Sequence, residues 1–148
     1  MSSDSYPGLT QPMIGALLRM ASERAHALLV IRLAEDGFDD VRSVHYSVFQ
    51  FPGPHGVRTV DLAIRTGMSK QALTPLLNDL ERLGYLERRQ SPDDGRGRVV
   101  WLTERGLAFA AAIKRVTTGI EREWSERLGQ DRFTMVRAAL EEIAGETS

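Results

Sequence analysis

The chain has 148 residues, of which 42% are hydrophobic and 26% are charged, and its formal net charge is −1. These values are typical of a globular protein with a single domain, residues 1–148, and no apolar run is long enough to span a membrane. Cysteine is absent, which excludes disulfides, thiolate zinc sites and cysteine nucleophiles, and with no secretory signal at the N-terminus we expect a cytoplasmic protein.

Two helices are predicted before residue 51. Apolar residues recur at steps of three and four over residues 13–35, which predicts a long first helix. Asp39 or Asp40 can cap a second helix. Its predicted apolar face consists of Val41, Val44, Val48 and Phe49. The segment "FPGPHG", residues 51–56, ends this helix with two prolines and two glycines.

A pair of short helices follows, separated by a glycine turn. Thr59 can cap the first of them, "VDLAIRT", and Gly67 can end it in a left-handed conformation. Ser69 is a suitable N-cap for the next helix. A short helix, a turn containing glycine and a second capped helix predict a helix-turn-helix.

The second helix of this pair, about residues 70–83, has one apolar and one polar face. Leucines recur at i, i+3, i+4, i+7 and i+10 from Leu73, so that face must be buried. The polar face presents Lys70, Gln71, Thr74, Asn78 and Glu81. Such side chains can contact base edges or phosphates in a major groove. Ser69 and the free N–H groups of the first turn also suit a phosphate.

Pro75 lies inside this helix and leaves two alternatives open. It removes the hydrogen bond to the carbonyl of Gln71, which costs about 3 kcal/mol in a helix interior. Either the helix continues through Pro75 with a kink, or Thr74 caps a shorter helix with Pro75 at its first position. We favour the continuous helix because the leucine stripe begins at Leu73.

After Gly84 the spacing changes from helical to extended. "YLERR" and "RVVWLT" predict two strands, joined by the turn-forming segment "QSPDDGRG". A hairpin directly after a helix-turn-helix is the wing of a winged helix. Its arginines are Arg88 and Arg89 on the first strand and Arg96 and Arg98 near the tip. An arginine at the tip can enter the minor groove, where the potential is most negative.

Two further helices are expected after Thr103, separated by Gly129. Their apolar stripes and that of the first helix exceed what one winged helix can cover, which indicates a subunit interface. The predicted fold is therefore mainly α (α+β): a winged helix-turn-helix with a two-stranded β wing, flanked by N- and C-terminal helices. Residues 57–106 carry nine basic and seven acidic side chains, a net +2 against −3 for the remainder, which favours one face that meets phosphate.

The run from Val60 to Gly106 resembles the winged-helix core of the multiple antibiotic resistance regulator (MarR) family. The resemblance lies in "LERLGYLERR", in a wing with Asp94 and Arg96 two residues apart, and in "LTERG". It implies a DNA-binding lobe at 39–105 and dimerisation helices at 10–36 and 106–146. It also implies a homodimeric transcriptional regulator of nearby genes, more often a repressor than an activator, that binds a pseudo-palindromic operator in double-stranded DNA.

The same resemblance implies roles for single residues. The residues expected to contact bases in the major groove are Lys70, Gln71 and Thr74. Arg96 is expected in the minor groove, with Asp94 bracing the wing through an ion pair, while Arg89 and Arg98 contact the DNA backbone.

A small-molecule effector is also implied, in a pocket between the dimerisation helices and the winged lobe. The candidate side chains, chosen because they are amphipathic or aromatic near that position, are His26, His45, Tyr46, Phe49 and Trp101. The three histidines lack the spacing of metal ligands, and no catalytic motif is present. We therefore expect no metal, no cofactor and no enzymatic activity.

Two other functions stay open at this point. The first alternative is a winged-helix protein-interaction module or adaptor that has lost DNA binding, which the acidic net charge and Pro75 suggest. The second is a small-molecule carrier of the same fold. Basic residues clustered on one surface around the 70–78 face would favour DNA.

Overall fold

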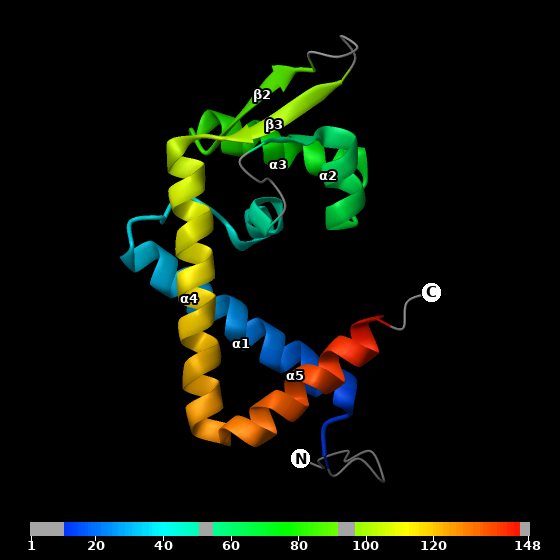
Figure 1. The fold of residues 1–148 in the computed structure, drawn as a ribbon, viewed down its shortest axis with the longest axis vertical. Helices are drawn as coiled ribbons and strands as arrows, with labels where there is room; N and C mark the ends of the chain where they lie inside the picture. Colours follow the sequence, from blue (N-terminus) through cyan, green and yellow to red (C-terminus); the bar gives the residue numbers. More distant parts are fainter. Residues whose placement is uncertain (1–10, 51–54, 92–96, 146–148) are drawn as a thin grey trace, which may run out of the picture.

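The computed structural model describes residues 11–50, 55–91 and 97–145. In chain order its elements are α1 (Ile14–Glu35), the 3-10 helix η1 (Ser43–Gln50), β1 (Val57–Arg58), α2 (Thr59–Thr66), α3 (Lys70–Arg82), β2 (Leu86–Gln90), β3 (Arg98–Leu102), α4 (Glu104–Leu128) and α5 (Gln130–Gly145). The sheet, α2 and α3 form a lobe at one end, from which α4 runs to the opposite end and turns into α5 (Figure 1). Within these residues, no helix is long and apolar enough to cross a membrane.

The sheet of the lobe is antiparallel, with strand order β1-β3-β2. The predicted hairpin is confirmed, and Gln90 pairs with Arg98 at the end nearest the tip. A third strand was not part of the predicted wing: the short β1 pairs Val57 with Val100 on the other edge of β3. The preceding chain is thereby fixed to the wing.

The second predicted helix is a 3-10 helix rather than an α-helix. With three residues per turn, residues three apart share a face, so Val48 joins His45 and Phe49 joins Tyr46 in the core. Val44 falls on the outer side and is 45% exposed, which contradicts its predicted place on the buried face. The predicted cap is also wrong for Asp40, whose carboxylate bonds elsewhere.

The helix-turn-helix forms nearly as predicted. Gly67 ends α2 with φ of 70°, and the Ser69 hydroxyl caps α3 by accepting from the Ala72 N–H. The cap predicted at Thr59 is wrong: α2 starts at Thr59 itself, and its hydroxyl donates to the Arg98 carbonyl. This bond attaches the helix to the wing.

Helix α3 continues through Pro75, as the leucine stripe suggested. Pro75 is exposed, so its ring lies away from the core. The preceding Thr74 donates its hydroxyl to the Lys70 carbonyl at 2.8 Å. The stripe stays seated because Leu73, Leu77 and Leu80 are fully buried.

An aromatic cluster joins α4 to the lobe. The ring of Phe109 lies 4.7 Å from that of Phe49, 5.0 Å from Phe38, 5.3 Å from Tyr85 and 5.7 Å from Tyr46, measured between centroids. The contacts are tilted or edge-on, which is the favourable arrangement for aromatic pairs. Side chains from before and after the helix-turn-helix therefore meet on one residue of α4.

Polar contacts reinforce this junction. The Tyr85 hydroxyl donates to Asp40 at 2.5 Å, and Arg105 donates to Asp40 at 2.8 Å while its guanidinium stacks on the Tyr85 ring. Burial, followed by the bond to Asp40, raises the pKa of Tyr85 to about 12. The Thr103 hydroxyl caps α4 at the Gly106 N–H.

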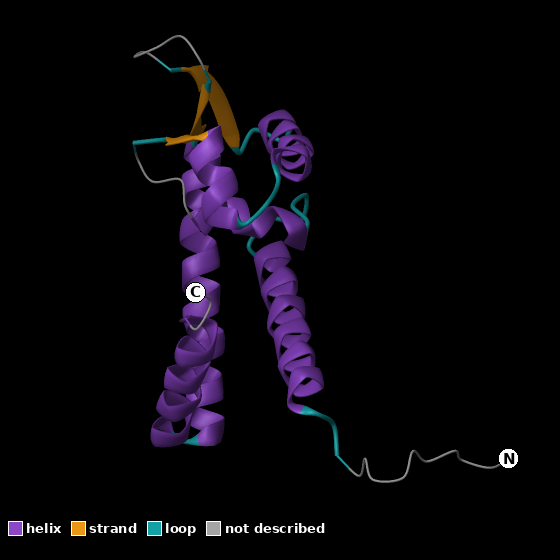
Figure 2. Ribbon diagram, turned by 90° about the vertical axis from the view of Figure 1, so that its right-hand side faces the viewer, coloured by secondary structure: helices purple, strands orange, loops and turns teal. Residues whose placement is uncertain are grey.

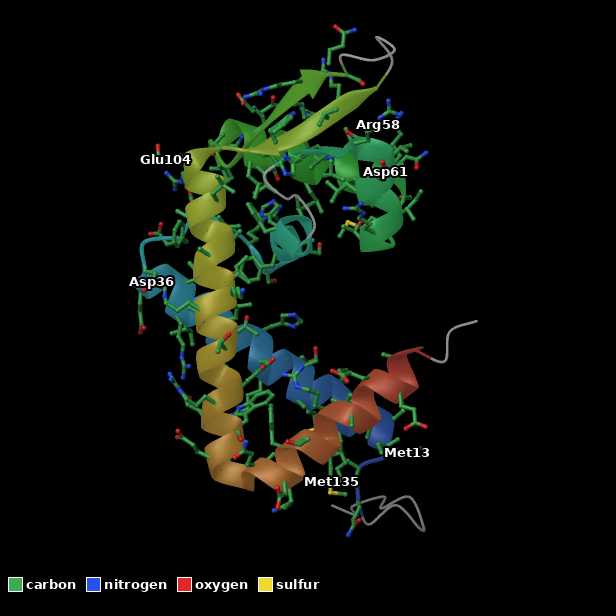
Figure 3. The ribbon with its side chains drawn as sticks, viewed as in Figure 1. Met13, Asp36, Arg58, Asp61, Glu104 and Met135 are labelled. Carbon is green, nitrogen blue, oxygen red and sulfur yellow. The ribbon has the colours of Figure 1, made fainter. Side chains whose placement is uncertain are left out.

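The opposite end of the molecule is apolar and uncovered. Figure 2 shows α1 diverging from the α4–α5 pair, and Met13 and Met135 both lie at this end (Figure 3). No residue of α5 is buried, and only Leu33 of α1 is. The exposed apolar side chains on these two helices are Met13, Ile14, Leu17, Leu18, Met20, Val30, Ile31, Met135, Val136, Leu140 and Ile143.

Gly106 is required where α4 meets the lobe. A Cβ atom at this position would lie 1.9 Å from the Tyr85 carbonyl oxygen, which is backbone and cannot rotate away. Gly106→Ala should lower the free energy of unfolding by at least about 1–3 kcal/mol, as overpacking does. Gly119 is the matched control, because it lies in the same helix with nothing within 4 Å of its Cβ position. Gly119→Ala should raise the free energy of unfolding by about 0.5–1 kcal/mol. If urea denaturation gave the same change in the free energy of unfolding for both variants, the steric requirement at Gly106 would be contradicted.

His45 is a buried titratable group, with 2% of its surface exposed. Its Nδ1 accepts from the Arg42 backbone N–H at 3.1 Å, so the neutral ring carries its proton on Nε2. That Nε2 is 3.6 Å from the Asp79 carboxylate on α3. Burial lowers the pKa of His45 below its ordinary value of 6.5, and the nearby Asp79 carboxylate offsets this only in part.

A lowered pKa in the folded state makes stability depend on pH. His45 should contribute stability above pH 6.5, and this should be lost as pH falls below that value, because only the unfolded chain then gains a proton easily. Urea denaturation between pH 7.5 and 5.5 should show stability falling with pH, and His45→Gln should flatten the profile. His26→Gln, which changes an exposed histidine of α1, should leave the slope unchanged.

Candidate nucleic-acid interface

The outer face of α3 is formed by polar side chains opposite the leucine stripe. Lys70, Gln71, Thr74 and Pro75 line a shallow surface hollow. Asn78 is exposed one turn further along the helix. The structure thus brings together the side chains predicted to contact bases, on a helix held from behind by buried leucines and capped by Ser69.

A second hollow, of about 340 Å³, opens where the start of α2, the start of α3 and the wing meet. It is lined by Arg58, Thr59, Val60, Ala63, Lys70, Gly97 and Arg98. Three of these side chains are cationic and come from β1, α3 and β3. Arg58 lies beside the start of α2, close to Asp61 (Figure 3). A hollow with cations on several sides suits an anionic group such as a phosphate.

The wing is fastened to α3 by Arg88. Its Nε and Nη2 donate to the Glu81 carboxylate at 2.9 and 2.6 Å, and Nη2 also donates to the Asn78 side-chain oxygen at 2.6 Å. The bond from Arg88 holds the pKa of Glu81 below its usual range. Only 15% of the Arg88 side chain is exposed, so this arginine is largely a structural link.

Arg89 points to the other face of the wing, since successive side chains alternate along a strand. It forms an ion pair with Glu87, and its guanidinium carbon lies 5.1 Å from the centre of the Trp101 ring. Trp101 in turn covers Gly56, where a Cβ atom would approach its ring to 2.8 Å. Arg89 is 58% exposed despite these contacts.

The tip of the wing cannot be compared with the prediction, because Asp94 and Arg96 lie outside the described residues. Arg98, at the start of β3, is exposed and lines the cationic hollow as well as a neighbouring one with Arg88, Gln90 and Gly97. Its position is compatible with a DNA backbone contact.

Asp79 anchors the far side of α3. Its carboxylate lies 3.4 Å from Arg42, 3.6 Å from Arg82 and 3.6 Å from His45. The arginines that pair with Asp79 come from the segment before η1 and from α3 itself. On the opposite flank of α3, Arg88 bonds to Asn78 and Glu81. The helix is therefore supported on both sides of its outer face.

The five predicted ligand-binding residues do not gather at one place. Tyr46 and Phe49 are buried against Phe109, and His45 faces Asp79. His26 lines a shallow surface hollow with Glu23, Ser43 and Val44. Trp101 lies on the outer face of the wing beside Arg89, not between the helices and the lobe. Among the described residues, no group of three or more His, Asp or Glu side chains is arranged to hold a metal ion.

Two residues of this surface were absent from the predicted site. Arg88 was noted only as a basic residue of the wing, although strand alternation places it on the same face as the buried Leu86. Arg58 carried no signal, because its place beside Lys70 and Arg98 depends on β1 joining the sheet.

Comparison with known proteins bears on this surface. A sequence model of the MarR family matches residues 44–97, which include most of η1, the helix-turn-helix and β2. The transcriptional regulator HosA of Escherichia coli O111:H- is 32% identical over 77 residues, which are 52% of this chain and 55% of HosA. The chain thus spans about half the length of this relative.

Solved structures match over most of the chain. The transcriptional repressor CouR bound to a 23-mer DNA duplex is 25% identical and superposes with a TM-score of 0.75, covering 89% of this chain and 92% of CouR. CouR from Rhodococcus jostii RHA1 bound to p-coumaroyl-CoA gives 0.71 at 23% identity, covering 91% and 94%. Apo MarR from E. coli gives 0.70 at 23% identity, covering 90% and 98%. The fold is that of these MarR-family structures, and residues 44–97 match the sequence model of the MarR family.

Proposed function

We propose that the chain is a sequence-specific, double-stranded-DNA-binding transcriptional regulator that acts as a homodimer on a pseudo-palindromic operator. The observation that carries this proposal is the continuity of two surfaces. The polar face of α3 and the cationic hollow share Lys70, and Arg58 and Arg98 complete the hollow. A helix face that can meet base edges therefore adjoins cations that can meet the flanking phosphates.

DNA is a better-supported partner than a protein. The interaction-module alternative drew on Pro75, yet α3 continues through this residue and keeps its leucine face buried. It also drew on the acidic net charge, whereas cations cluster around the start of α3. CouR, which superposes over 89% of this chain, is seen bound to a DNA duplex, and no catalytic role is part of the proposal.

Binding through phosphates makes a quantitative prediction. The affinity for a selected operator should fall linearly with salt on logarithmic axes, by a slope of about 0.9 per phosphate neutralised. Lys70→Ala should weaken binding and lower the slope by about one. Lys114→Ala is the matched control, because this exposed lysine lies on α4, away from the lobe. An affinity that does not respond to salt in a fluorescence-anisotropy titration would contradict the proposal.

The homodimer is supported by the apolar surface that α1 and α5 leave uncovered. Met135 and Ile143 on α5 are 71% and 58% exposed, and Ile14 on α1 is 76% exposed. The Trp124 and Phe133 side chains line a hollow between α4 and α5 that continues this surface. Contiguous apolar surface of this kind marks a subunit interface, and a second copy presents the same complementary helices under two-fold symmetry.

Charged substitutions should separate the two copies. Ile143→Glu or Leu17→Glu should weaken dimerisation at least about tenfold, because each removes apolar burial of about 1.5–3 kcal/mol. Ile64→Glu is the matched control. Ile64 is an exposed apolar residue like the other two, with 76% of its surface exposed, but it lies on α2 in the lobe. Sedimentation velocity should find monomers for the first two variants and dimers for the third. Dimers in all three cases would place the interface elsewhere.

We further propose that the regulator is a repressor relieved by a small-molecule effector. CouR has been solved both with DNA and with p-coumaroyl-CoA, which supports this part of the proposal. An effector bound near η1 could act on α3, because His45 of η1 faces Asp79 of α3. The predicted ligand contacts are His26, His45, Tyr46, Phe49 and Trp101.

A further inference from the structure

The contact between Arg88 and Asn78 fixes how α3 presents an amide to its surroundings. A guanidinium has only donors, so the atom that faces Arg88 at 2.6 Å must be the Asn78 oxygen Oδ1. The orientation of this amide is therefore determined by chemistry and not by an arbitrary choice between oxygen and nitrogen. The Nδ2–H₂ group therefore lies on the side of the amide that faces away from Arg88.

The Arg88 guanidinium is itself held in place. Glu81 accepts from Nε and Nη2, and it also accepts from the Arg88 backbone N–H at 3.4 Å. Charge-assisted, two-pronged bonds of this kind are short and directional. With 15% of its side chain exposed, Arg88 lies behind the DNA-facing surface, whereas Asn78 is exposed on the outer face of α3.

We propose that Arg88 is a positioning residue that sets the base specificity of Asn78, making it a hydrogen-bond donor to acceptors in the major groove. This inference rests on the proposed DNA-binding function. An unconstrained asparagine recognises adenine by donating to N7 and accepting from the N6 amino group. One of the two lone pairs of Oδ1 is taken by Arg88 and the amide orientation is fixed, so we expect the Nδ2–H₂ group to make the main contact, with purine N7, guanine O6 or thymine O4.

The strand pattern of the wing provides a matched control. Arg89 follows Arg88 directly and carries the same charge, but it points to the other face and contacts Glu87 and Trp101. Arg88→Met and Arg89→Met each remove one charge from neighbouring positions of β2. Only the first removes a contact with α3.

The experiment begins with selection of an operator by the native protein from random duplexes. Affinity is then measured for every single-base change in that operator with the native protein, Asn78→Ala, Arg88→Met, the double variant and Arg89→Met. We expect Asn78→Ala and Arg88→Met to relax preference at the same position by about five- to tenfold, with no further loss in the double variant. Arg89→Met should lower affinity alike at all positions.

Base analogues identify the polarity of the contact. Replacing the purine at that position by its 7-deaza analogue, or thymine by an analogue without O4, should weaken native binding several-fold and leave Asn78→Ala unaffected. Removing only the adenine amino group should change little. A strong loss on removing that amino group would overturn the inference, as would an Arg88→Met profile identical to that of the native protein or of Arg89→Met.

A measurement without DNA separates the inference from the proposed function. In ¹⁵N NMR spectra the Asn78 side-chain amide should show a distinct chemical shift and restricted side-chain motion by relaxation, and Arg88→Met should remove both. If the Asn78 amide signals of the native protein and of Arg88→Met were the same, the contact between Arg88 and Asn78 would be refuted. If Arg88→Met does not fold, Arg88→Lys keeps the charge but cannot reach Glu81 and Asn78 with one planar fork, and it should relax the same position. A native protein that selects no DNA would instead refute the proposed function.

Discussion

Phe109 of α4 lies among the rings of Phe38, Tyr46, Phe49 and Tyr85, and through this contact the long helix and the winged lobe become one body. These rings come from three segments, namely the chain before η1, η1 itself and the chain before β2, and Phe109 contacts all four of them. The close approach of Gly106 to the Tyr85 backbone and the Asp40–Arg105 pair fix the same junction by sterics and charge. Every other feature takes its position from it.

One consequence is the separation of the two ends of the molecule. Because α4 starts at the lobe and extends away from it, α1 and α5 meet solvent at the far end with apolar side chains exposed. The hydrophobic core, which joins Leu62, Leu77 and Val100 of the lobe to Leu33 of α1 and Ile120 of α4, does not include those exposed side chains. The apolar side chains of α1 and α5 are therefore left uncovered by the rest of the chain.

A second consequence concerns the wing. Strand alternation directs Arg88 towards α3 and Arg89 away from it, so two neighbouring arginines of the same charge have different physical roles. Arg88 is a short link between β2 and the outer face of α3, and Thr59 links α2 to β3 through the Arg98 carbonyl. The helix-turn-helix and the wing thus form a rigid frame, in which a change in one element alters the surface presented by the other.

The sequence by itself determined most of the helices, the hairpin of the wing and the resemblance to the MarR family. Local chemistry was sufficient for this: Ser69 and Thr103 cap their helices, Gly67 adopts positive φ, and the leucines of α3 bury one face despite Pro75. Tertiary structure decided what local patterns do not encode. A 3-10 geometry turned Val44 outward, β1 placed Arg58 beside Lys70, and the packing of the sheet placed Trp101 against Arg89. Such outcomes depend on which distant segments come together, and the spacing of residues within one segment does not specify its partners.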